Sequence, residues 1–325
     1  MERVTIIIPV YNVENYIRKC AISLFSQQYD NIEFIFVNDC TPDNSIKALE
    51  ETVNNFPERI HQIKIINHNR NKGSAATRNS GLNVSTGQYV IFIDGDDYCE
   101  PNMINDMVYF MKENGADTVV SDFYVNYSHK EYIKKQIPSK HGKQCISMVL
   151  QGILHASTCN KLLNKEIIDK NQIRFIEGLN VWEDLLFMVR YFFYAENIVY
   201  TNKPYLHYVQ HNASQTSAMS SKSLENLNGI VSEISSFLSD KRLYKQYSND
   251  IMQLKNTVKF VWLQSISSEN YNKLKNLYPE SNKYIWRNKV FPIYYKIALV
   301  SVVNGYYLIA KSIVKLVGFI KVNLR

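Results

Sequence analysis

The N-terminal part of the chain alternates short apolar runs with amphipathic segments. Five runs are apolar and rich in β-branched residues; they cover residues 4–10, 32–37, 63–66, 89–93 and 118–120. Runs this uniformly apolar are typical of strands buried on both faces, as in a parallel sheet covered by helices. The pattern therefore predicts a strand at each of these places.

The segments between the runs have helical periodicity. After the first run, one stripe of the expected helix carries Val13, Ile17, Cys20, Ala21, Leu24 and Phe25. We expect further helices at residues 44–56, 74–84 and 101–113, the last with proline in its first turn. This alternation predicts an α/β fold, with an open, mostly parallel sheet and helices on both faces.

The alternation ends near residue 143, and from about residue 220 the pattern is helical. We therefore predict a first domain over residues 1–218, with halves at 1–130 and 131–218. A helical C-terminal region should follow over residues 219–325.

The net charge of +7 is unevenly distributed. Residues 281–325 hold eight Lys or Arg and no Asp or Glu, which leaves 29 basic against 30 acidic residues, a net of −1, in the rest of the chain. A body with balanced charge argues against nucleic acid as a partner.

Cysteine usage and the first residues indicate the compartment. The five cysteines are odd in number and form no C-x-x-C pair, which argues against a disulfide framework or a zinc site. The start "MERVTIIIPV" has too short an apolar run for a secretory signal and is interpreted as the first strand. We expect a cytoplasmic protein.

Carboxylates follow the fourth predicted strand. Asp94, Asp96 and Asp97 in "DGDD" could together hold a magnesium or manganese ion that bridges substrate phosphates. By itself such a string is more often a turn with a glycine. Its place at the carboxyl end of a strand, where open α/β sheets bind ligands, favours the metal site.

The second strand ends at another carboxylate. Asp39 could accept a hydrogen bond from a ribose hydroxyl or a base N–H. The alternative is an Asx turn or a helix cap, although Asp43 and Asn44 are better placed to cap the helix that follows.

The segment after the third strand is basic. It brings Arg70, Lys72 and Arg78 together with Gly73 and Gly81, which favours a site for a pyrophosphate. A basic loop before a helix of small residues is an equally good interpretation. The chain lacks G-x-G-x-x-G after the first strand and has no G-x-x-x-x-G-K-[ST], which argues against a dinucleotide oxidoreductase and a P-loop NTPase.

Four segments in this order carry a family resemblance: "TIIIPVYN", "VNDCTPDNS", "NKGSAATRNSGL" and "FIDGDDYCEP". The chain resembles family 2 glycosyltransferases of the GT-A fold, of the bacterial surface-polysaccharide type, closely over residues 1–130 and loosely over 150–215. The resemblance implies a nucleotide-sugar donor and makes residues 1–130 the donor half and 131–218 the acceptor half.

The resemblance also assigns donor-side roles. It places Pro9, Tyr11 and Asp39 around the base and ribose, and Asp94 and Asp96, as a D-x-D motif, at the metal and diphosphate. Asn38 stands where the family commonly has an aspartate, which puts the nucleotide contacts in doubt rather than catalysis.

The segment "GLNVWEDLLFMVRYFF" supplies the acceptor-side candidates. In similar enzymes the aspartate of such an "ED" pair is the catalytic base, which makes Asp184 our choice beside Glu183. Both could instead merely favour a helix N-terminus electrostatically. Trp182 could stack on an acceptor sugar or belong to the core.

One family arginine, which closes over the donor phosphates, aligns with Val209. His207, His211 or Ser214 could take its place.

The basic end predicts contact with a membrane surface. The apolar run at residues 297–310 is shorter than the roughly 20 residues that span a bilayer. Lys311 and Lys315 share one helical face, as in a helix that lies on an anionic inner leaflet. The alternative is a helix folded back on the catalytic domain with solvated lysines.

Together these features predict a metal-dependent, inverting glycosyltransferase on the inner face of the cell membrane. It would move a sugar from a nucleoside diphosphate, UDP by preference, to a hydroxyl of a lipid-linked or polymeric glycan. A catalytically impaired nucleotide-sugar-binding or scaffold protein and a nucleotidyltransferase are the alternatives.

Overall fold

The computed structural model describes residues 1–210, 220–288 and 290–323. The chain divides into two compact units. The first runs from Met1 to Ile146 and resumes at Leu154, and the second combines Ser147–Ile153 with the helical residues from 220 onward.

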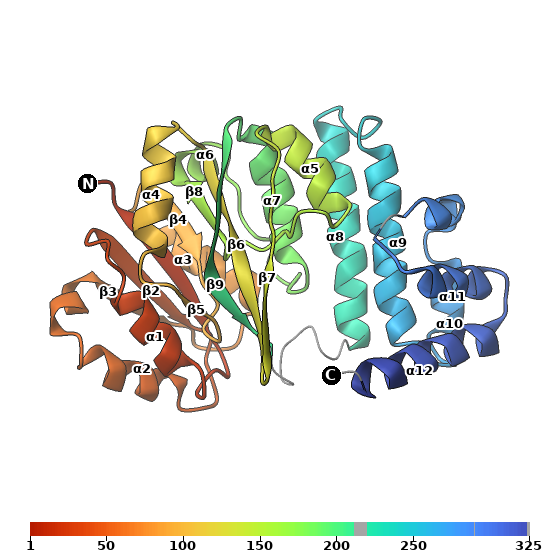
Figure 1. The fold of residues 1–325 in the computed structure, drawn as a ribbon, viewed down its shortest axis with the longest axis horizontal. Helices are drawn as coiled ribbons and strands as arrows, with labels where there is room; N and C mark the ends of the chain where they lie inside the picture. Colours follow the sequence, from red (N-terminus) through yellow and green to blue (C-terminus); the bar gives the residue numbers. More distant parts are fainter. Residues whose placement is uncertain (211–219, 289, 324–325) are drawn as a thin grey trace. The chain divides into compact units, whose positions relative to one another are not determined.

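Within the described residues, nine strands of the first unit form one sheet (Figure 1). The strands are β1 (Val4–Val10), β2 (Ile32–Asn38), β3 (Ile63–Asn67), β4 (Tyr89–Phe92), β5 (Tyr98–Cys99), β6 (Thr118–Tyr127), β7 (Lys130–Lys134), β8 (Lys161–Asn164) and β9 (Ile198–Val209). Their order is β3-β2-β1-β4-β8-β6-β9-β5, and β7 pairs with β6 outside this path.

The first four strands confirm the predicted parallel sheet. β1 pairs in parallel with β2 and β4, and β2 with β3. Beyond β4 the sheet is mixed: β8 runs antiparallel to β4 and β6, β5 to β9 and β7 to β6, while β6 and β9 are parallel. Only two residues separate β6 from β7, and a parallel return needs a crossover of about a dozen or more.

Helices cover both faces of the sheet, as predicted. Ile6 and Ile8 of β1 belong to a core cluster with residues of α1 (Ile17–Phe25). The intervening Ile7 points to the other face, where a Cβ at Gly81 of α3 (Ser74–Val84) would lie 2.4 Å from the Ile7 Cγ2 atom. Because successive strand residues face opposite sides, α1 and α3 lie on opposite faces of the sheet.

Some predicted boundaries were wrong. α3 matches its prediction, but α2 (Ser45–Val53) and α4 (Met103–Glu113) are shorter than expected. β6 is much longer than the predicted 118–120. The strand continues through Ser121 and Asp122, which are polar but fully buried. Their polar atoms find partners: the Ser121 hydroxyl donates to the Asn160 carbonyl, and Asp122 accepts from the Gln136 N–H.

The remaining elements of the first unit connect these strands. They are η1 (Pro57–Gln62), α5 (Gly142–Leu150, which continues into the second unit), α6 (Lys165–Lys170) and α7 (Glu183–Tyr194). The carboxyl ends of β1, β2 and β3 are aligned, since Val10 pairs with Asn38 and Asn38 with Asn67. The residues after these strands therefore start at one edge of the sheet.

The second unit is helical over the described residues. It contains α8 (Ser221–Asp240), α9 (Ser248–Gln264), α10 (Tyr271–Asn276), η2 (Pro279–Arg287), α11 (Ile293–Val303) and α12 (Tyr307–Asn323). Its interior is mostly apolar: Ile230, Val258 and Leu299 are almost fully buried, together with the polar Asn256 and Lys259. No helix in the described ranges has the length and apolar character needed to cross a membrane.

Candidate functional site

Arg78 of α3 joins carboxylates from two distant segments. Its Nη2 donates to Asp94 Oδ1 at 2.8 Å, just after β4, and its Nη1 donates to Glu183 Oε1 at 2.6 Å, at the start of α7. Asp184 Oδ1 lies 3.9 Å from the same Nη1. The carboxylate predicted after the fourth strand and the two predicted at the start of a later helix thus lie around one guanidinium group.

The Arg78 guanidinium stays charged although it is buried. Burial opposes the positive charge, but the carboxylates of Asp184, Asp94 and Glu183 more than compensate, and the pKa of Arg78 lies well above its ordinary value. The sequence placed Arg78 with Arg70 and Lys72 at a pyrophosphate. Arg78 is instead enclosed among carboxylates, whereas Arg70 and Lys72 are exposed.

Asp184 is held by the backbone and side chain of one threonine. Its carboxylate accepts from the Thr158 N–H at 3.2 Å and from the Thr158 hydroxyl at 3.3 Å. Burial raises the pKa of Asp184 to about 6, opposed by Arg78 and reinforced by the charge of Glu183. A carboxylate with this pKa is ionised at neutral pH and basic enough to accept a proton from a hydroxyl group.

Glu183 has a different environment. Its Oε1 accepts from both the Ser74 hydroxyl and Arg78 Nη1, each at 2.6 Å. These two contacts tie α7 to α3, so Glu183 fits a structural part better than proton transfer.

Trp182 precedes this pair in a strained conformation. Its φ of +60° is in the left-handed region, which bulky residues seldom adopt. Strained backbone of this kind is tolerated where the surrounding structure fixes it and is frequent at functional sites. The ring is partly exposed, which leaves its predicted contact with an acceptor sugar a prediction.

A loop fixed by Lys161 contacts the carboxylates of Asp184 and Asp94. The buried Nζ of Lys161 donates to the His155 carbonyl (2.8 Å), the Ser157 carbonyl (2.7 Å) and Asn160 Oδ1 (2.8 Å). From this loop, residues 155–160, Thr158 reaches Asp184, and the Cys159 thiol donates to Asp94 Oδ2 at 3.5 Å.

An amine that donates three hydrogen bonds is a protonated ammonium group. Lys161 makes three such bonds, although burial lowers its pKa to about 7. Sequence reasoning missed Lys161 and Thr158. Nothing in the string "STCNKLLN" distinguishes a clamped lysine from an exposed one.

Asp39 organises the segment that leads into α3. Its Oδ1 accepts from the Lys72 N–H at 2.8 Å and lies 2.7 Å from His68 Nδ1, and its Oδ2 accepts from the Gly73 N–H at 2.8 Å. Gly73 has a φ of +88°, and a Cβ there would lie 2.3 Å from Asn180 Nδ2. The position therefore requires glycine, and Asp39 is already engaged with the backbone.

The other donor-side candidates lie at or next to the ends of β1 and β2. Asn38 Nδ2 donates to Asn67 Oδ1 at 2.8 Å, and Asn38 Oδ1 accepts from the Thr41 N–H at 2.9 Å. Tyr11 is 43% exposed beyond the end of β1, and Pro9 is partly buried within it. A nucleotide at this edge would meet side chains fixed by the strands.

The carboxylates of "DGDD" do not all point outward. Asp97 is buried and its Oδ1 accepts from the Val209 N–H at 2.9 Å. Burial, followed by the charges of Asp96 and Asp94, raises the pKa of Asp97 well above its ordinary value. Asp97 thus links the turn after β4 to the end of β9.

No metal site is visible in the described parts of the chain: no three His, Cys, Asp or Glu residues converge there closely enough to hold an ion. The chemistry of the donor set nevertheless fits a hard cation. Asp97 Oδ2 is a buried carboxylate oxygen for which the described residues provide no partner, next to the mutually repelling charges of Asp94 and Asp96. Magnesium typically uses one or two carboxylates together with substrate phosphates.

His207 is built into the sheet. Its ring stacks between Tyr98 (4.2 Å between centroids) and Tyr124 (4.3 Å), and its Nε2 lies 2.9 Å from Glu100 Oε1. It is therefore poorly placed to replace the family arginine at Val209. His211 and Ser214 lie outside the described residues.

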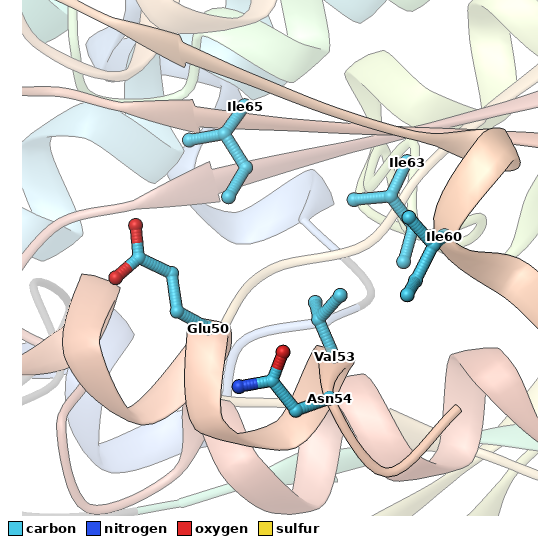
Figure 2. Close-up of a pocket in the computed structure, with 6 residues that line it drawn as sticks. All are labelled: Glu50, Val53, Asn54, Ile60, Ile63 and Ile65. Atoms are coloured by element: carbon cyan, nitrogen blue, oxygen red, sulfur yellow. The ribbon is translucent and has the colours of Figure 1, made fainter. Parts of the chain in front are cut away.

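A separate pocket of about 220 Å³ lies at the β3 edge of the sheet (Figure 2). It is lined by Glu50, Val53, Asn54, Ile60, Ile63 and Ile65, from α2, η1 and β3. Figure 2 shows mostly apolar side chains, with Glu50 at one side. The lining shares no residue with the network around Arg78 and lacks the converging polar groups of a substrate site.

Comparison with known proteins identifies a family whose match includes several of these residues. The model of the family "Glycosyl transferase family 2" matches residues 5–171, which include Asp39, Arg78, Asp94 and Thr158 but stop before Asp184. Putative glycosyltransferase EpsH of Bacillus subtilis (strain 168) is 27% identical over 286 residues, which cover 84% of this chain and 81% of EpsH.

A relative and a solved structure come from Staphylococcus aureus. Poly(ribitol-phosphate) beta-N-acetylglucosaminyltransferase TarP of strain N315 is 26% identical over 200 residues, covering 61% of this chain and 59% of TarP. The crystal structure of TarS 1–349 in complex with UDP-GlcNAc superposes with a TM-score of 0.67 at 20% identity, covering 96% of this chain and 90% of that one. At this identity the structural likeness concerns the fold alone.

Proposed function

Because the chain belongs to glycosyl transferase family 2 and has the GT-A fold, we propose that it transfers a sugar from a nucleoside diphosphate to a glycan hydroxyl with inversion. The observation that carries this proposal is the position of Asp184. A carboxylate with a pKa of about 6 shares the Arg78 guanidinium with Asp94 at the end of β4. A candidate base is thus coupled to the donor edge of the sheet.

In this reaction Asp184 acts as the general base. The acceptor oxygen attacks the anomeric carbon and loses its proton to Asp184, while the bond from that carbon to the diphosphate oxygen breaks and its electron pair leaves with the nucleoside diphosphate. Thr158 donates two hydrogen bonds that fix the carboxylate, and Arg78 lies close enough to favour its ionised form. General-base catalysis of this kind contributes about 10²- to 10⁴-fold.

The leaving group would be held at the strand ends. Asp94, Asp96 and the Oδ2 atom of Asp97 are the groups that would bind a magnesium or manganese ion, while Asp97 Oδ1 holds the Val209 N–H. When bound, such an ion would neutralise the charge that develops on the departing diphosphate. The exposed Arg70 and Lys72 are free to contact phosphate oxygens as well.

For the nucleotide we propose uridine, near Pro9, Tyr11, Asn38 and Asp39. The aligned ends of β1 and β2 support a binding edge there, and the TarS complex with UDP-GlcNAc supports the choice of base. Asn38 provides an amide where an aspartate is usual, and an amide both donates and accepts.

For the acceptor we propose a lipid-linked or polymeric glycan of the cell surface, met on the cytoplasmic face of the membrane. TarP, whose name describes transfer to poly(ribitol phosphate), supports a polymeric acceptor. Trp182, beside Asp184, would stack on the acceptor sugar.

A thermal-shift screen of UDP-, GDP- and CDP-sugars, with and without manganese, tests donor binding. A ligand at 100 times its Kd stabilises the folded state by about 2.7 kcal/mol. We expect UDP-sugars to raise the melting temperature most, and manganese to increase the shift in the wild type but not in Asp94→Asn. If no nucleotide sugar shifts the melting temperature, the proposal is wrong.

The products then separate the alternatives. Release of nucleoside diphosphate with a membrane fraction as acceptor is the expected result. Release of pyrophosphate would instead show a nucleotidyltransferase. Donor binding without turnover would favour an impaired binding or scaffold protein, for which Asn38 in the aspartate position and Val209 in the arginine position are the supporting features.

A further inference from the structure

The outer face of α12 is unusually apolar. Leu308 is 74% exposed, Leu316 61% and Ile309 51%, whereas Ala310 on the opposite side of the helix is fully buried. At 100° per residue, Leu308, Ile309 and Leu316 fall within about one third of a turn of each other. A helix that packs by one apolar face and presents another to water indicates a surface for a further contact.

Cations accompany this apolar face. Lys311 and Lys315 lie beside Leu308 on the helix surface, and residues 281–325 contain eight Lys or Arg with no acidic residue. The same unit exposes further large apolar side chains, including Ile293 (67%) and Trp286 (55%). A partner must therefore offer an apolar region that can bury these side chains, with negative charge beside it.

Other occupants fit this chemistry less well. Among the described helices none is long and apolar enough to cross a bilayer. A second copy of α12 would oppose like charges, because Lys311 and Lys315 would face the same lysines and there is no Asp or Glu from residue 281 onward to pair with them. An anionic lipid surface supplies both requirements: phosphates for the lysines and an acyl boundary for the leucines.

We propose that the outer face of α12 docks on an anionic lipid bilayer. Leu308, Ile309 and Leu316 enter the boundary between headgroups and acyl chains, and Lys311 and Lys315 contact lipid phosphates. The proposal rests on the proposed function only for its purpose, which is to bring the enzyme to an acceptor at the membrane. The contact itself needs no catalysis.

Vesicle sedimentation of the 325-residue chain tests this surface. We expect the wild type to sediment with vesicles of phosphatidylcholine and phosphatidylglycerol, less with phosphatidylcholine alone, and less again at high salt because surface charges are screened. Lys311→Glu with Lys315→Glu should weaken binding by about 25-fold or more. Leu308→Ser with Leu316→Ser should weaken it by at least about tenfold.

Matched controls come from the first unit. Lys47→Glu changes the charge of an exposed lysine on α2, and Ile137→Ser removes an apolar side chain that is 63% exposed. Neither should alter vesicle binding. All variants should keep the melting temperature of the wild type and its shift by nucleotide sugars.

Three results would overturn the inference. One is a wild type that does not sediment with anionic vesicles, and another is equal binding by the α12 variants and the controls. The third is a dimer, seen by light scattering, that Leu308→Ser with Leu316→Ser converts to monomers, which would assign the face to a second copy. Vesicle binding without any nucleotide-sugar binding would instead remove the proposed function alone.

Discussion

The two sides of the candidate site are built by different means. On the donor side, Asp39 is fixed by the main chain: parallel strands align its position, and the amides of Lys72 and Gly73 hold its carboxylate. On the base side, Thr158 holds Asp184, and two buried cations hold the groups around it: Arg78 pairs with Asp94 and Glu183, and Lys161 fixes the loop that carries Thr158. We therefore expect the donor side to be sensitive to added atoms and the base side to lost charges.

Removing Arg78 should give the largest effect. Arg78→Met leaves Asp94 and Glu183 without their cation, and breaking a buried ion pair in this way costs about 3–5 kcal/mol. Urea denaturation measures the free energy of unfolding. Arg18→Met is the control, because Arg18 and Glu51 are about half exposed and such pairs contribute about 0–1 kcal/mol.

A second substitution separates charge from packing at this site. If the cost of Arg78→Met comes from unpaired carboxylates, adding Glu183→Gln should recover part of the lost stability. Equal losses for Arg78→Met and Arg18→Met would contradict the dependence of the base side on its buried charges.

Removing the Lys161 clamp should follow in size. Lys161→Met removes the ammonium group from three oxygen acceptors and leaves a polar loop without its clamp, at a cost of about 2–3 kcal/mol. Because the clamped loop carries Thr158, we also expect the catalytic rate to fall more than donor affinity, as steady-state kinetics would measure. Lys203→Met, at a side chain 59% exposed, should change either quantity little, and a similar loss in both variants would argue against the clamp.

On the donor side, adding a single methyl group at Gly73 should lower stability and weaken nucleotide binding. Gly73→Ala combines a left-handed backbone with a Cβ 2.3 Å from the Asn180 side chain, and we expect a loss of about 1–3 kcal/mol together with weaker nucleotide binding. Gly178→Ala has nearly the same φ, +89°, but open space around the new Cβ. It should show the backbone strain alone, and identical results for the two variants would show that the contact with Asn180 is unimportant.

The smallest expected effect is the pH dependence of the transfer rate, which should reflect the protonation of Asp184. Burial raises the pKa of Asp184 to about 6, and a general base acts only when it is deprotonated. The rate should be constant above this pH and fall about tenfold per unit below it. A rate profile at saturating donor measures this, and a flat profile from pH 5 to pH 7 would exclude Asp184 as the titrating group.

The sequence predicted the donor side best, because its signals are local. Uniform apolar runs predicted β1 to β4, and a helix over residues 74–84 was found with those bounds. The polar residues that follow the strands were expected at one edge, since parallel strands share the direction of their carboxyl ends. The mixed half of the sheet has no comparable signal, because its pairings join distant segments of different character.

The base side was predicted only in part, because its contacts are made between side chains far apart in sequence. Arg78 and Glu183 are separated by 105 residues, so the local basic pattern suggested a phosphate ligand where the structure shows an ion pair. Lys161 gave no signal at all, since only the folded loop supplies its three acceptors. The family resemblance, rather than periodicity, pointed to Asp184.

Asp184→Asn tests the account most directly. The amide keeps the shape of the carboxylate and can still accept from the Thr158 N–H, but it cannot take a proton. We predict that release of nucleoside diphosphate in the presence of acceptor falls by about 10²- to 10⁴-fold, with the nucleotide-sugar thermal shift unchanged. Glu177→Gln, at an exposed position seven residues earlier in the chain, should keep full activity. Transfer by Asp184→Asn at the wild-type rate would contradict the account.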